Sequence, residues 1–471
     1  MLIRFSFKNF RSVGEDPITL DMVSTSKIQR FKDHICATSH NARILRNAVI
    51  YGGNASGKST IFTALLFMRH VVLNGALPQG AQVEYCKCGA GLKDQDSVFD
   101  IQLYINGRAF DYGFSCNLTQ LKVISEWLYE LGDKPEKLFE RTGSDSVDCQ
   151  GLEQNSSEVD QTRLGVYRDD FLHRAREGMG SELFLSALAN GRNYLDGSAL
   201  ASLADVYSWF NSNFSPIGAG QSPMSSEFYG HGANLDKVAE VLASFDTGIN
   251  SLHKQEIGMD ELEKYIPAEA LLSIKRIVSE NIPSGPQTES TVTFRSDDVF
   301  LSIESKGVSE PHATVLKLRH EGSVLDFDFG EESDGTKRLF DFMDILFTKS
   351  KDKLFLIDEL NRSFHPMLTQ QLVSLFNRVH AQDDCQLVFT THENAIMSFE
   401  YFRRDEIWFV ERNGQGHSVL FPLDKFADNR ARSDARVNKQ YLEGRYGGIP
   451  VLSTGRALSA LGVIGESDAS A

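Results

Sequence analysis

The chain has 471 residues, of which 41% are hydrophobic and 10% aromatic, so it is long enough to form two or three lobes with sizeable cores. Its formal net charge of −16 argues against a surface built to coat nucleic acid, although a local basic groove inside an acidic average remains compatible with that charge. No apolar run approaches the roughly 18 to 20 residues needed to cross a bilayer, which excludes a membrane-spanning subunit.

The cysteines and the N-terminus indicate a cytoplasmic setting. Six cysteines are scattered along the chain, and the opening sequence, MLIRFSF, lacks the zones of a secretory signal. Cys86 and Cys88 form a C-x-C pair, but no second pair or suitably spaced histidines accompany it. We therefore interpret these two residues as free thiols in a strand or turn.

The N-terminal part predicts strands around a single helix. Apolar and polar residues alternate over 3–8, as in a half-buried strand, and a second strand, PITLDMV, follows a turn at Gly14. The apolar segment 44–53 enters a glycine-rich loop, after which apolar residues recur at helical spacing. Residues 98–141 predict β-hairpins, with Asn106-Gly107 as the strongest turn signal.

The remainder of the chain alternates between helices and strands. Helix-like patterns separated by Gly, Ser and Pro clusters fill 147–290, strands return from 291 to 329, and helices then alternate with apolar strands. Such alternation predicts an α/β fold. The expected domains are the first half of an α/β domain (1–146), an inserted mainly helical lobe (147–290), the second half (291–425) and a C-terminal tail (426–471).

The strongest motif, GGNASGKST, has the spacing of a P-loop between a predicted strand and a predicted helix. Its glycines allow backbone N–H groups to surround phosphate oxygens, Lys58 reaches the β- and γ-phosphates, and Ser59 offers a hydroxyl to Mg²⁺. The alternative is a glycine turn before an amphipathic helix. The predicted ATP-binding residues are Gly52, Gly53, Asn54, Ala55, Ser56, Gly57, Lys58, Ser59 and Thr60.

A second carboxylate arm follows about 300 residues later in LFLIDE. Asp358 is predicted to hold Mg²⁺, and Glu359 is placed to accept a proton from the attacking water. The alternative is an ordinary strand that ends in a polar turn. The wide separation from the P-loop predicts that a large lobe is inserted between two halves of one nucleotide-binding sheet.

The next apolar strand, QLVFTTH, ends in His392. A histidine there is able to hydrogen-bond a γ-phosphate or the catalytic water, because the carboxyl ends of neighbouring parallel strands converge on one crevice. We therefore predict a catalytic sensing role for His392, although an isolated strand-end histidine is more often structural.

Together these motifs resemble the ABC-type ATPase heads of the SMC and RecF-like class. The N-terminal IRFSFKNFRSV resembles the first strand pair of these heads, and RRDEIWFVER and YLEGRYGGIP resemble AAA or ABC-like ATPases of phage-defence operons, of abortive-infection, Septu and PARIS type. The resemblance covers roughly 1–140 and 290–450 and gives no residue for the Q-loop. It implies a P-loop sheet with an antiparallel β-subdomain, and ATP and Mg²⁺ as cofactors.

The resemblance also gives a role to EESDGTKRL, which occupies the place of the ABC signature loop. It implies that Ser333, Asp334, Gly335 and Thr336 contact the γ-phosphate of ATP held by the opposite subunit; Asp334 departs from the glycine common in transporters. A serine hydroxyl and glycine amides before a helix N-terminus suit an anion. The alternative is a solvated loop before a helix. NRSFHP, Asn361 to Pro366, matches the D-loop of the dimer interface.

The resemblance implies a cytoplasmic, Mg²⁺-dependent ATPase that dimerises around ATP. By the same analogy it is a sensor or scaffold switch for an effector protein, a nuclease or toxin encoded nearby, in anti-phage defence. One alternative is a DNA repair or recombination ATPase, which predicts salt-sensitive DNA binding. The basic residues of the tail leave DNA contact open, although acids interrupt them and favour a solvated or subunit-facing surface. These residues are Arg430, Arg432, Arg436, Lys439 and Arg445.

A self-contained nuclease is the other alternative. Asp297 and Asp298, followed by Glu304 and Lys306, mimic the acid and E-x-K elements of a restriction-type metal site. The acids stand only about six residues before the E-x-K, and alternating charge along a strand explains the same residues. We therefore expect any further chemistry to come from a partner.

Overall fold

The chain folds into two compact units. Unit 1 comprises Met1–Ser212 and Val388–Ala471, and unit 2 comprises Asn213–Leu387. The computed structural model describes residues 1–25, 28, 30–38, 42–143, 146–179, 182–192, 194, 198–219, 235–258, 261–262, 265–266, 289–296, 298–306, 312–348, 351–426, 437–449 and 460–461.

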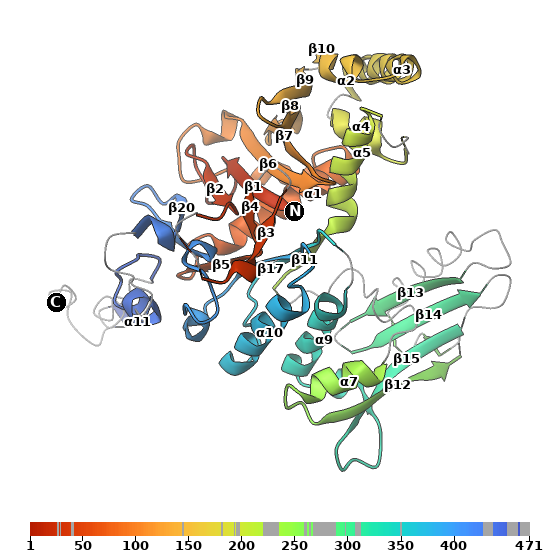
Figure 1. Ribbon diagram of the computed structural model, residues 1–471, viewed down its shortest axis with the longest axis vertical. Helices are drawn as coiled ribbons and strands as arrows, with labels where there is room; N and C mark the ends of the chain where they lie inside the picture. Colours follow the sequence, from red (N-terminus) through yellow and green to blue (C-terminus); the bar gives the residue numbers. More distant parts are fainter. Residues whose placement is uncertain are drawn as a thin grey trace. The chain divides into compact units, whose positions relative to one another are not determined.

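Unit 1 contains a seven-stranded antiparallel sheet with the order β10-β9-β8-β7-β6-β1-β2 (Figure 1). Its hairpins follow the sequence pattern closely. Strands β6 and β7 pair from Ser97↔Cys116 to Ile105↔Arg108, and Asn106 and Gly107 form the turn with φ of 50° and 83°. This confirms the predicted Asn-Gly turn. The strands are β1 (Leu2–Lys8), β2 (Ile18–Asp21), β6 (Ser97–Ile105), β7 (Arg108–Asn117), β8 (Lys122–Leu131), β9 (Glu136–Thr142) and β10 (Ser146–Asp148).

An aromatic core joins this sheet to helix α1 (Lys58–Asn74). Phe67 of α1 lies 5.1 Å from Phe10 and 5.0 Å from Phe99, measured between ring centroids. Phe99 in turn packs on Phe7 and Phe114 of the neighbouring strands. Because aromatic side chains each bury a large apolar area, this cluster fixes α1 against the antiparallel sheet.

A parallel pair of strands carries the start of α1. Strand β5 (Asn47–Gly52) pairs in parallel with β19 (Ile407–Arg412), from Val49↔Ile407 to Gly52↔Val410, and β19 pairs antiparallel with β20 (Ser418–Pro422). All six residues of β5 are buried, as expected for a central strand of an α/β fold. The other elements of this region are β3 (Ile35–Ala37), β4 (Arg43–Leu45) and α11 (Val437–Leu442).

The opposite face of the antiparallel sheet carries a pair of neighbouring carboxylates, Asp100 and Asp111. The indole Nε1 of Trp127 lies 3.3 Å from a carboxylate oxygen of each. Burial, and secondly the charge of Asp111, raise the pKa of Asp100 from 3.8 to about 7. Asp100 therefore keeps its proton up to near-neutral pH in the folded protein.

We expect Asp100→Asn to stabilise the protein at pH 8, by about 1–3 kcal/mol, and to have little effect at pH 4.5. The folded protein binds the proton of Asp100 more tightly than the unfolded chain does. The wild-type stability therefore falls as the pH rises from about 4 towards 7, and Asn removes that penalty. Urea unfolding curves of both proteins at the two pH values provide the test. An equal difference at both pH values would contradict the raised pKa of Asp100.

Four helices of unit 1 belong to the segment predicted to be mainly helical. One of them, α4, is held to the sheet by the buried carboxylate of Glu126, which accepts hydrogen bonds from the backbone N–H groups of Phe184 (2.6 Å) and Leu185 (3.0 Å). It also accepts from the Tyr112 hydroxyl (3.1 Å) and forms an ion pair with Arg141 (3.9 Å). The helices are α2 (Gln150–Gln154), α3 (Glu158–Arg174), α4 (Phe184–Ala189) and α5 (Ala201–Ser208).

Unit 2 combines a parallel strand pair with a separate antiparallel sheet. Strand β11 (Phe214–Ile217) pairs in parallel with β17 (Leu354–Ile357), from Phe214↔Leu354 to Ile217↔Ile357. The antiparallel sheet has the order β12-β15-β14-β13, with β16 paired to β15. Its elements and the helices of unit 2 are α7 (Leu235–Ala243), β12 (Ile249–Ile257), β13 (Glu289–Arg295), β14 (Phe300–Lys306), β15 (His312–His320), β16 (Phe327–Asp328), α9 (Asp334–Phe347) and α10 (Pro366–Val379).

The segment 147–290 also contains strands β11 and β12, which the helical pattern of the sequence did not indicate. Pro216 lies in β11, at the edge of its sheet, where a missing backbone N–H is tolerated. Residues 259–281 belong to the same segment, and most of them fall outside the described residues. The domain boundaries expected from the sequence therefore stay predictions.

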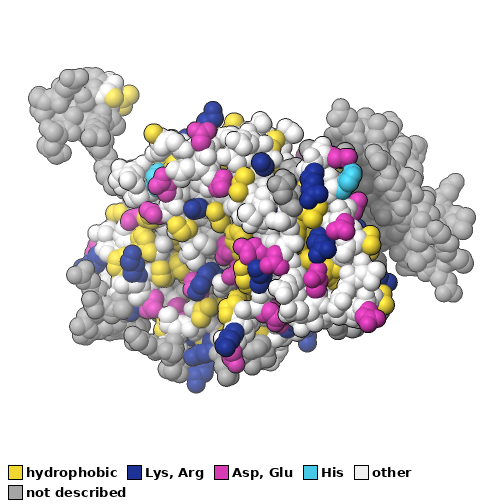
Figure 2. Space-filling model, turned by 90° about the horizontal axis from the view of Figure 1, so that it is seen from above, with side chains coloured by type: hydrophobic (Ala, Val, Ile, Leu, Met, Phe, Trp, Pro, Cys, Tyr) yellow, Lys and Arg dark blue, Asp and Glu magenta, His cyan; other side chains and the backbone are white. Residues whose placement is uncertain are grey.

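The surface shows interspersed charge. On the face seen in Figure 2, basic and acidic side chains alternate across the described residues, with scattered hydrophobic side chains between them. Among the described residues, no helix is both long and apolar enough to cross a membrane. Cys88 is exposed, and the other five cysteines are buried.

Candidate functional site

The glycine-rich loop connects β5 to α1 in unit 1 and requires glycine at two positions. Gly57 has a φ of 111°, and a Cβ there would collide with Ser418. A Cβ on Gly52 would approach the carbonyl oxygen of Val410 to 2.5 Å. Close backbone packing and a left-handed φ thus explain both glycines.

Two residues of the β19–β20 hairpin hold carbonyl groups of the loop from outside. Arg412 Nε donates to the carbonyl of Ala55 (2.7 Å), and the Ser418 hydroxyl donates to the carbonyl of Ser56 (2.5 Å). A carbonyl held on one side places the N–H of the same peptide plane on the other side. The N–H of Gly57 therefore points away from Ser418, as an anion-binding loop requires.

The lysine of the loop is buried and folded over it. Lys58 is 6% exposed, and its ammonium donates to the carbonyls of Gly52 (2.8 Å) and Gly53 (3.0 Å). The neighbouring Ser59 is exposed at the first turn of α1. A buried cation at a helix N-terminus fits a phosphate chain, and the Ser59 hydroxyl is a suitable Mg²⁺ ligand.

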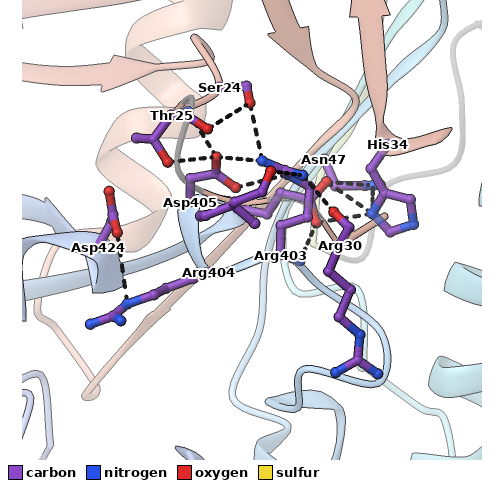
Figure 3. A network of polar contacts seen from close by, with 11 residues as sticks. Ser24, Thr25, Arg30, His34, Asn47, Arg403, Arg404, Asp405 and Asp424 are labelled. Atoms are coloured by element: carbon purple, nitrogen blue, oxygen red, sulfur yellow. Dashed lines mark hydrogen bonds and ion pairs between the residues drawn. The ribbon is translucent and has the colours of Figure 1, made fainter. Parts of the chain in front are cut away.

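A buried polar network, which we call the β19 anchor, fixes the strands beside this loop (Figure 3). Arg403 makes two hydrogen bonds of 2.9 Å to Asp405 and donates to the Ser24 hydroxyl (3.0 Å) and the Arg30 carbonyl (2.6 Å). The carboxylate of Glu406 accepts a hydrogen bond from Asn47 Nδ2 (3.0 Å). A second oxygen of the same carboxylate lies 3.0 Å from His34 Nδ1.

The β19 anchor acts at the first residues of two strands. Asn47 begins β5 and Ile407, directly after Glu406, begins β19. Because Glu406 binds Asn47, the starts of the two parallel strands are held in register, and the loop that follows β5 is held with them.

His392 follows strand β18 (Gln386–Thr390), whose residues are all buried. The backbone N–H of Thr391 donates to the carbonyl of Ile50 (3.1 Å), two residues before Gly52. This bond places the end of β18 beside the strand that enters the glycine-rich loop. His392 itself is exposed, and its catalytic role stays a prediction.

The two acids predicted for the metal and the base lie at the end of β17 in unit 2. Asp358 is 6% exposed, and its backbone N–H donates to the carbonyl of Ile217 (3.0 Å). Glu359 has a φ of 54°, a left-handed conformation that is uncommon for residues other than glycine. Such strained positions gather at functional sites.

The segment after these acids is a compact turn. Arg362 N–H donates to the carbonyl of Glu359 (3.0 Å), Ser363 has a φ of 64°, and Phe364 N–H donates to Asn361 (3.1 Å). The turn ends at His365, whose ring accepts from the N–H of Met367 (3.3 Å) and caps α10. The assignment of 361–366 as a D-loop stays a prediction.

The predicted signature loop forms the N-terminus of α9. Ser333 is the N-cap, and its hydroxyl accepts from the backbone N–H of Thr336 (3.1 Å). Glu332, just before it, lies 2.6 Å from the imidazole of His320. Ser333 and Asp334 are exposed, so the capped helix end is open to an anion.

An arginine that the sequence patterns did not indicate lies behind this helix end. Arg338 is 7% exposed, and its Nη1 is 3.3 Å from Asp341 Oδ2 and 3.4 Å from the carbonyl of Gly218. Burial, and then the charge of Arg362, lower the pKa of Arg338 to about 10, and the charges of Asp358 and Glu359 oppose that lowering. The charge of Arg338 therefore interacts electrostatically with the carboxylates of Asp358 and Glu359.

The structure describes the other sequence candidates only in part. Glu304 forms an ion pair with Lys254 (2.8 Å), Asp297 lies outside the described residues, and only the backbone of Lys306 is described. Within the described part of the chain, no group of three His, Cys, Asp or Glu residues is arranged to hold a metal ion. In the tail, Lys439 and Arg445 both pair with Glu443, and Arg430, Arg432 and Arg436 are not described.

The fold and the glycine-rich loop define a P-loop nucleotide-binding protein with a mixed α/β architecture. The chain belongs to the family described as AAA domain, putative AbiEii toxin, Type IV TA system, whose model matches residues 48–398. The expected resemblance to an abortive-infection ATPase family is thereby confirmed. Among curated proteins, no sequence matches at a significant level.

Two similar solved structures are heads of SMC proteins. One, an SMC head bound to the C-terminal winged-helix domain of ScpA, is 11% identical with a TM-score of 0.40, and the match covers 89% of this chain and 97% of that one. The other, the SMC head domain from Thermotoga maritima, is 14% identical with a TM-score of 0.33, and covers 89% and 98%. These scores are too low to transfer any detail to this chain.

Proposed function

We propose that the protein is an ATP-hydrolysing switch that dimerises around ATP and controls a partner effector protein. The observation that carries the nucleotide part is the loop from Gly52 to Thr60, with its buried lysine and its carbonyls held from outside by the β19–β20 hairpin. Membership in an AAA family supports the same assignment.

In the proposed reaction, the lysine and the loop amides hold the phosphates of ATP. Lys58 exchanges the carbonyls of Gly52 and Gly53 for phosphate oxygens, which are stronger partners for a cation. Mg²⁺, held by Ser59 and Asp358, would neutralise charge on the phosphates. Glu359 accepts a proton as water attacks the γ-phosphorus, the bond to the β-phosphate oxygen breaks, and ADP leaves; His392 would sense the γ-phosphate.

The dimeric part of the proposal rests on α9. Its N-terminus carries the Ser333 cap, and both Ser333 and Asp334 are exposed there. A helix end of this kind attracts an anion from another molecule, here the γ-phosphate of ATP on the partner. Association and release would then follow the nucleotide state.

The effector is proposed to be a nuclease or toxin, and the process to be anti-phage defence. The family description, which names a putative toxin and a toxin–antitoxin system, supports this setting. The acidic net charge favours a protein partner over DNA. A repair ATPase acting on DNA would instead show hydrolysis that DNA stimulates and salt suppresses.

We expect Ser333→Arg to prevent ATP-driven dimerisation while the single subunit still binds ATP. The arginine places bulk and a long side chain at the helix end that would meet the partner's γ-phosphate, whereas Lys58 and its loop are unchanged. Light scattering with and without Mg²⁺-ATP, and equilibrium ATP binding below the dimerisation concentration, measure the two effects separately.

The matched control is Ser323→Arg, because Ser323 lies in the same unit, in the turn that follows β15. This variant should dimerise as the wild type does. If isolated Ser333→Arg subunits lose ATP binding as strongly as they lose dimerisation, the result would argue against a contact between Ser333 and the ATP of the partner.

A further inference from the structure

We propose that Arg338 is a positioning residue for Asp358 and Glu359 of its own subunit, although it belongs to the helix whose N-terminus faces the partner. The inference rests on the proposed function, since it assigns Arg338 to one half of a composite ATP site. Helix α9 would then have two roles. Its exposed cap, Ser333, acts on the ATP site of the partner, and its buried cation, Arg338, acts on the ATP site of its own subunit.

Helix α9 is fitted tightly against the segment that follows the two acids. A Cβ on Gly335 would come within 2.9 Å of the carbonyl oxygen of Ser363, so the first turn of the helix touches this turn backbone to backbone. Further along the helix, the ring centroids of Phe342 and Phe364 lie 5.6 Å apart. The helix and the turn therefore form a single packed piece within unit 2.

Arg338 reaches from this helix to the point where Asp358 is fixed. Its Nη1 is 3.4 Å from the carbonyl of Gly218, and the carbonyl of the preceding residue, Ile217, accepts the backbone hydrogen bond of Asp358 (3.0 Å). The guanidinium is thus placed beside the strand end that sets the position of the first acid. A cation here offsets the repulsion between two consecutive carboxylates.

The buried acid beside Arg338 keeps a second cation when Arg338 is changed. Asp341 forms an ion pair with Arg295, which also donates to the carbonyl of Lys337 (2.6 Å). Loss of the Arg338 charge therefore does not leave Asp341 alone, and a variant of similar volume is expected to fold. The effect of such a variant falls on Asp358 and Glu359.

Glu359 is the residue that most needs such support. Its left-handed backbone, with φ of 54°, persists only where the surroundings hold it in place. A fixed positive charge near a carboxylate favours one orientation of the carboxylate. Without Arg338, ATP should still bind, but turnover should fall because the proton acceptor is less well placed.

Mixed dimers provide the test, made from two differently tagged chains and purified through both tags in the presence of Mg²⁺-ATP. Every pair keeps at least one ATP site with an unchanged Ser333 loop, which is expected to hold the two chains together. The reference pair combines a Ser333→Arg chain with a Glu359→Gln chain. In the proposed dimer each ATP site uses Glu359 of one chain and Ser333 of the other, so both changes fall in the same site. The other site is intact, and turnover should be roughly half that of the wild type. If this pair is inactive, the composite site itself, and with it the proposed function, is wrong.

The inference is tested with Arg338→Met, which keeps the side-chain stem and removes the charge. A chain carrying it should behave like Glu359→Gln: active when paired with Ser333→Arg, and inactive when paired with Glu359→Gln. Arg338→Lys should restore most of the turnover of the homodimer with an unchanged KM for ATP.

Three results would overturn the inference while the reference pair remains active. The first is that the Arg338→Met chain is active when paired with Glu359→Gln and inactive when paired with Ser333→Arg, which would assign Arg338 to the partner's site. The second is inactivity in both pairs, and the third is an Arg338→Met homodimer with wild-type turnover.

Discussion

Glu359→Gln is expected to lower ATP turnover by roughly 10²- to 10⁴-fold and to leave ATP binding intact, because a glutamine cannot accept the proton of the attacking water. Glutamine is close in size and tolerates the left-handed backbone about as well as glutamate does, so the turn from Glu359 to Phe364 should persist. The variant should therefore accumulate as an ATP-bound dimer. Phosphate release under saturating ATP, together with light scattering, measures both consequences.

A suitable control is Glu321→Gln, which removes an exposed carboxylate of the same unit and should leave turnover unchanged. If Glu359→Gln hydrolyses ATP at the normal rate, another group is the proton acceptor. Loss of ATP binding in Glu359→Gln would indicate instead that the change disturbs the nucleotide site as a whole.

Glu126→Ala is expected to lower the free energy of unfolding by about 3–5 kcal/mol, since it breaks a buried ion pair and leaves the other partner buried. The change removes the acceptor of the Phe184 and Leu185 N–H groups and leaves the guanidinium of Arg141 without its nearby carboxylate. Burial raises the pKa of Glu126, and Arg141 is the first of the groups that oppose this rise. Chemical unfolding monitored by tryptophan fluorescence provides the measurement.

Two further variants show whether burial is the cause. Glu126→Gln keeps an acceptor oxygen for the N–H groups of α4, so its loss should be smaller. Glu130→Ala breaks the partly exposed pair with Arg108 and should cost only about 0–1 kcal/mol. Equal losses for Glu126→Ala and Glu130→Ala would contradict the role given to the buried pair.

Local patterns in the sequence predicted much of the fold. The buried strands β5 and β17 stand out because four or more apolar residues precede a polar motif, and the Asn106-Gly107 turn requires left-handed φ angles that few other residues adopt. The P-loop was recognisable because glycines and a lysine at fixed spacing between a strand and a helix have few other uses. These signals all lie within short stretches of chain.

The features that were missed depend on contacts between distant segments. Ser418 and Arg412 hold the carbonyls of Ser56 and Ala55 across more than 350 positions, and nothing in VER or HSV marks them as partners of a glycine-rich loop. Arg338 follows a lysine at the start of a helix, where charged residues are usually exposed, and only the structure shows that it is buried. Strand β11 escaped because its short sequence, FSPI, contains a proline and follows a helical pattern.

The β19 anchor has a consequence for synthesis of the chain on the ribosome. It joins Ser24, His34 and Asn47 to Arg403, Asp405 and Glu406, and β5 pairs with β19 only after β19 has emerged. Contacts between such distant positions form late. A prematurely terminated chain would contain every residue of the glycine-rich loop and still lack the strand, the arginine and the serine that shape it. Translation therefore delivers a competent ATP site only after β20 has been made, so chains that end before Ser418 should be unable to act as nucleotide-bound decoys.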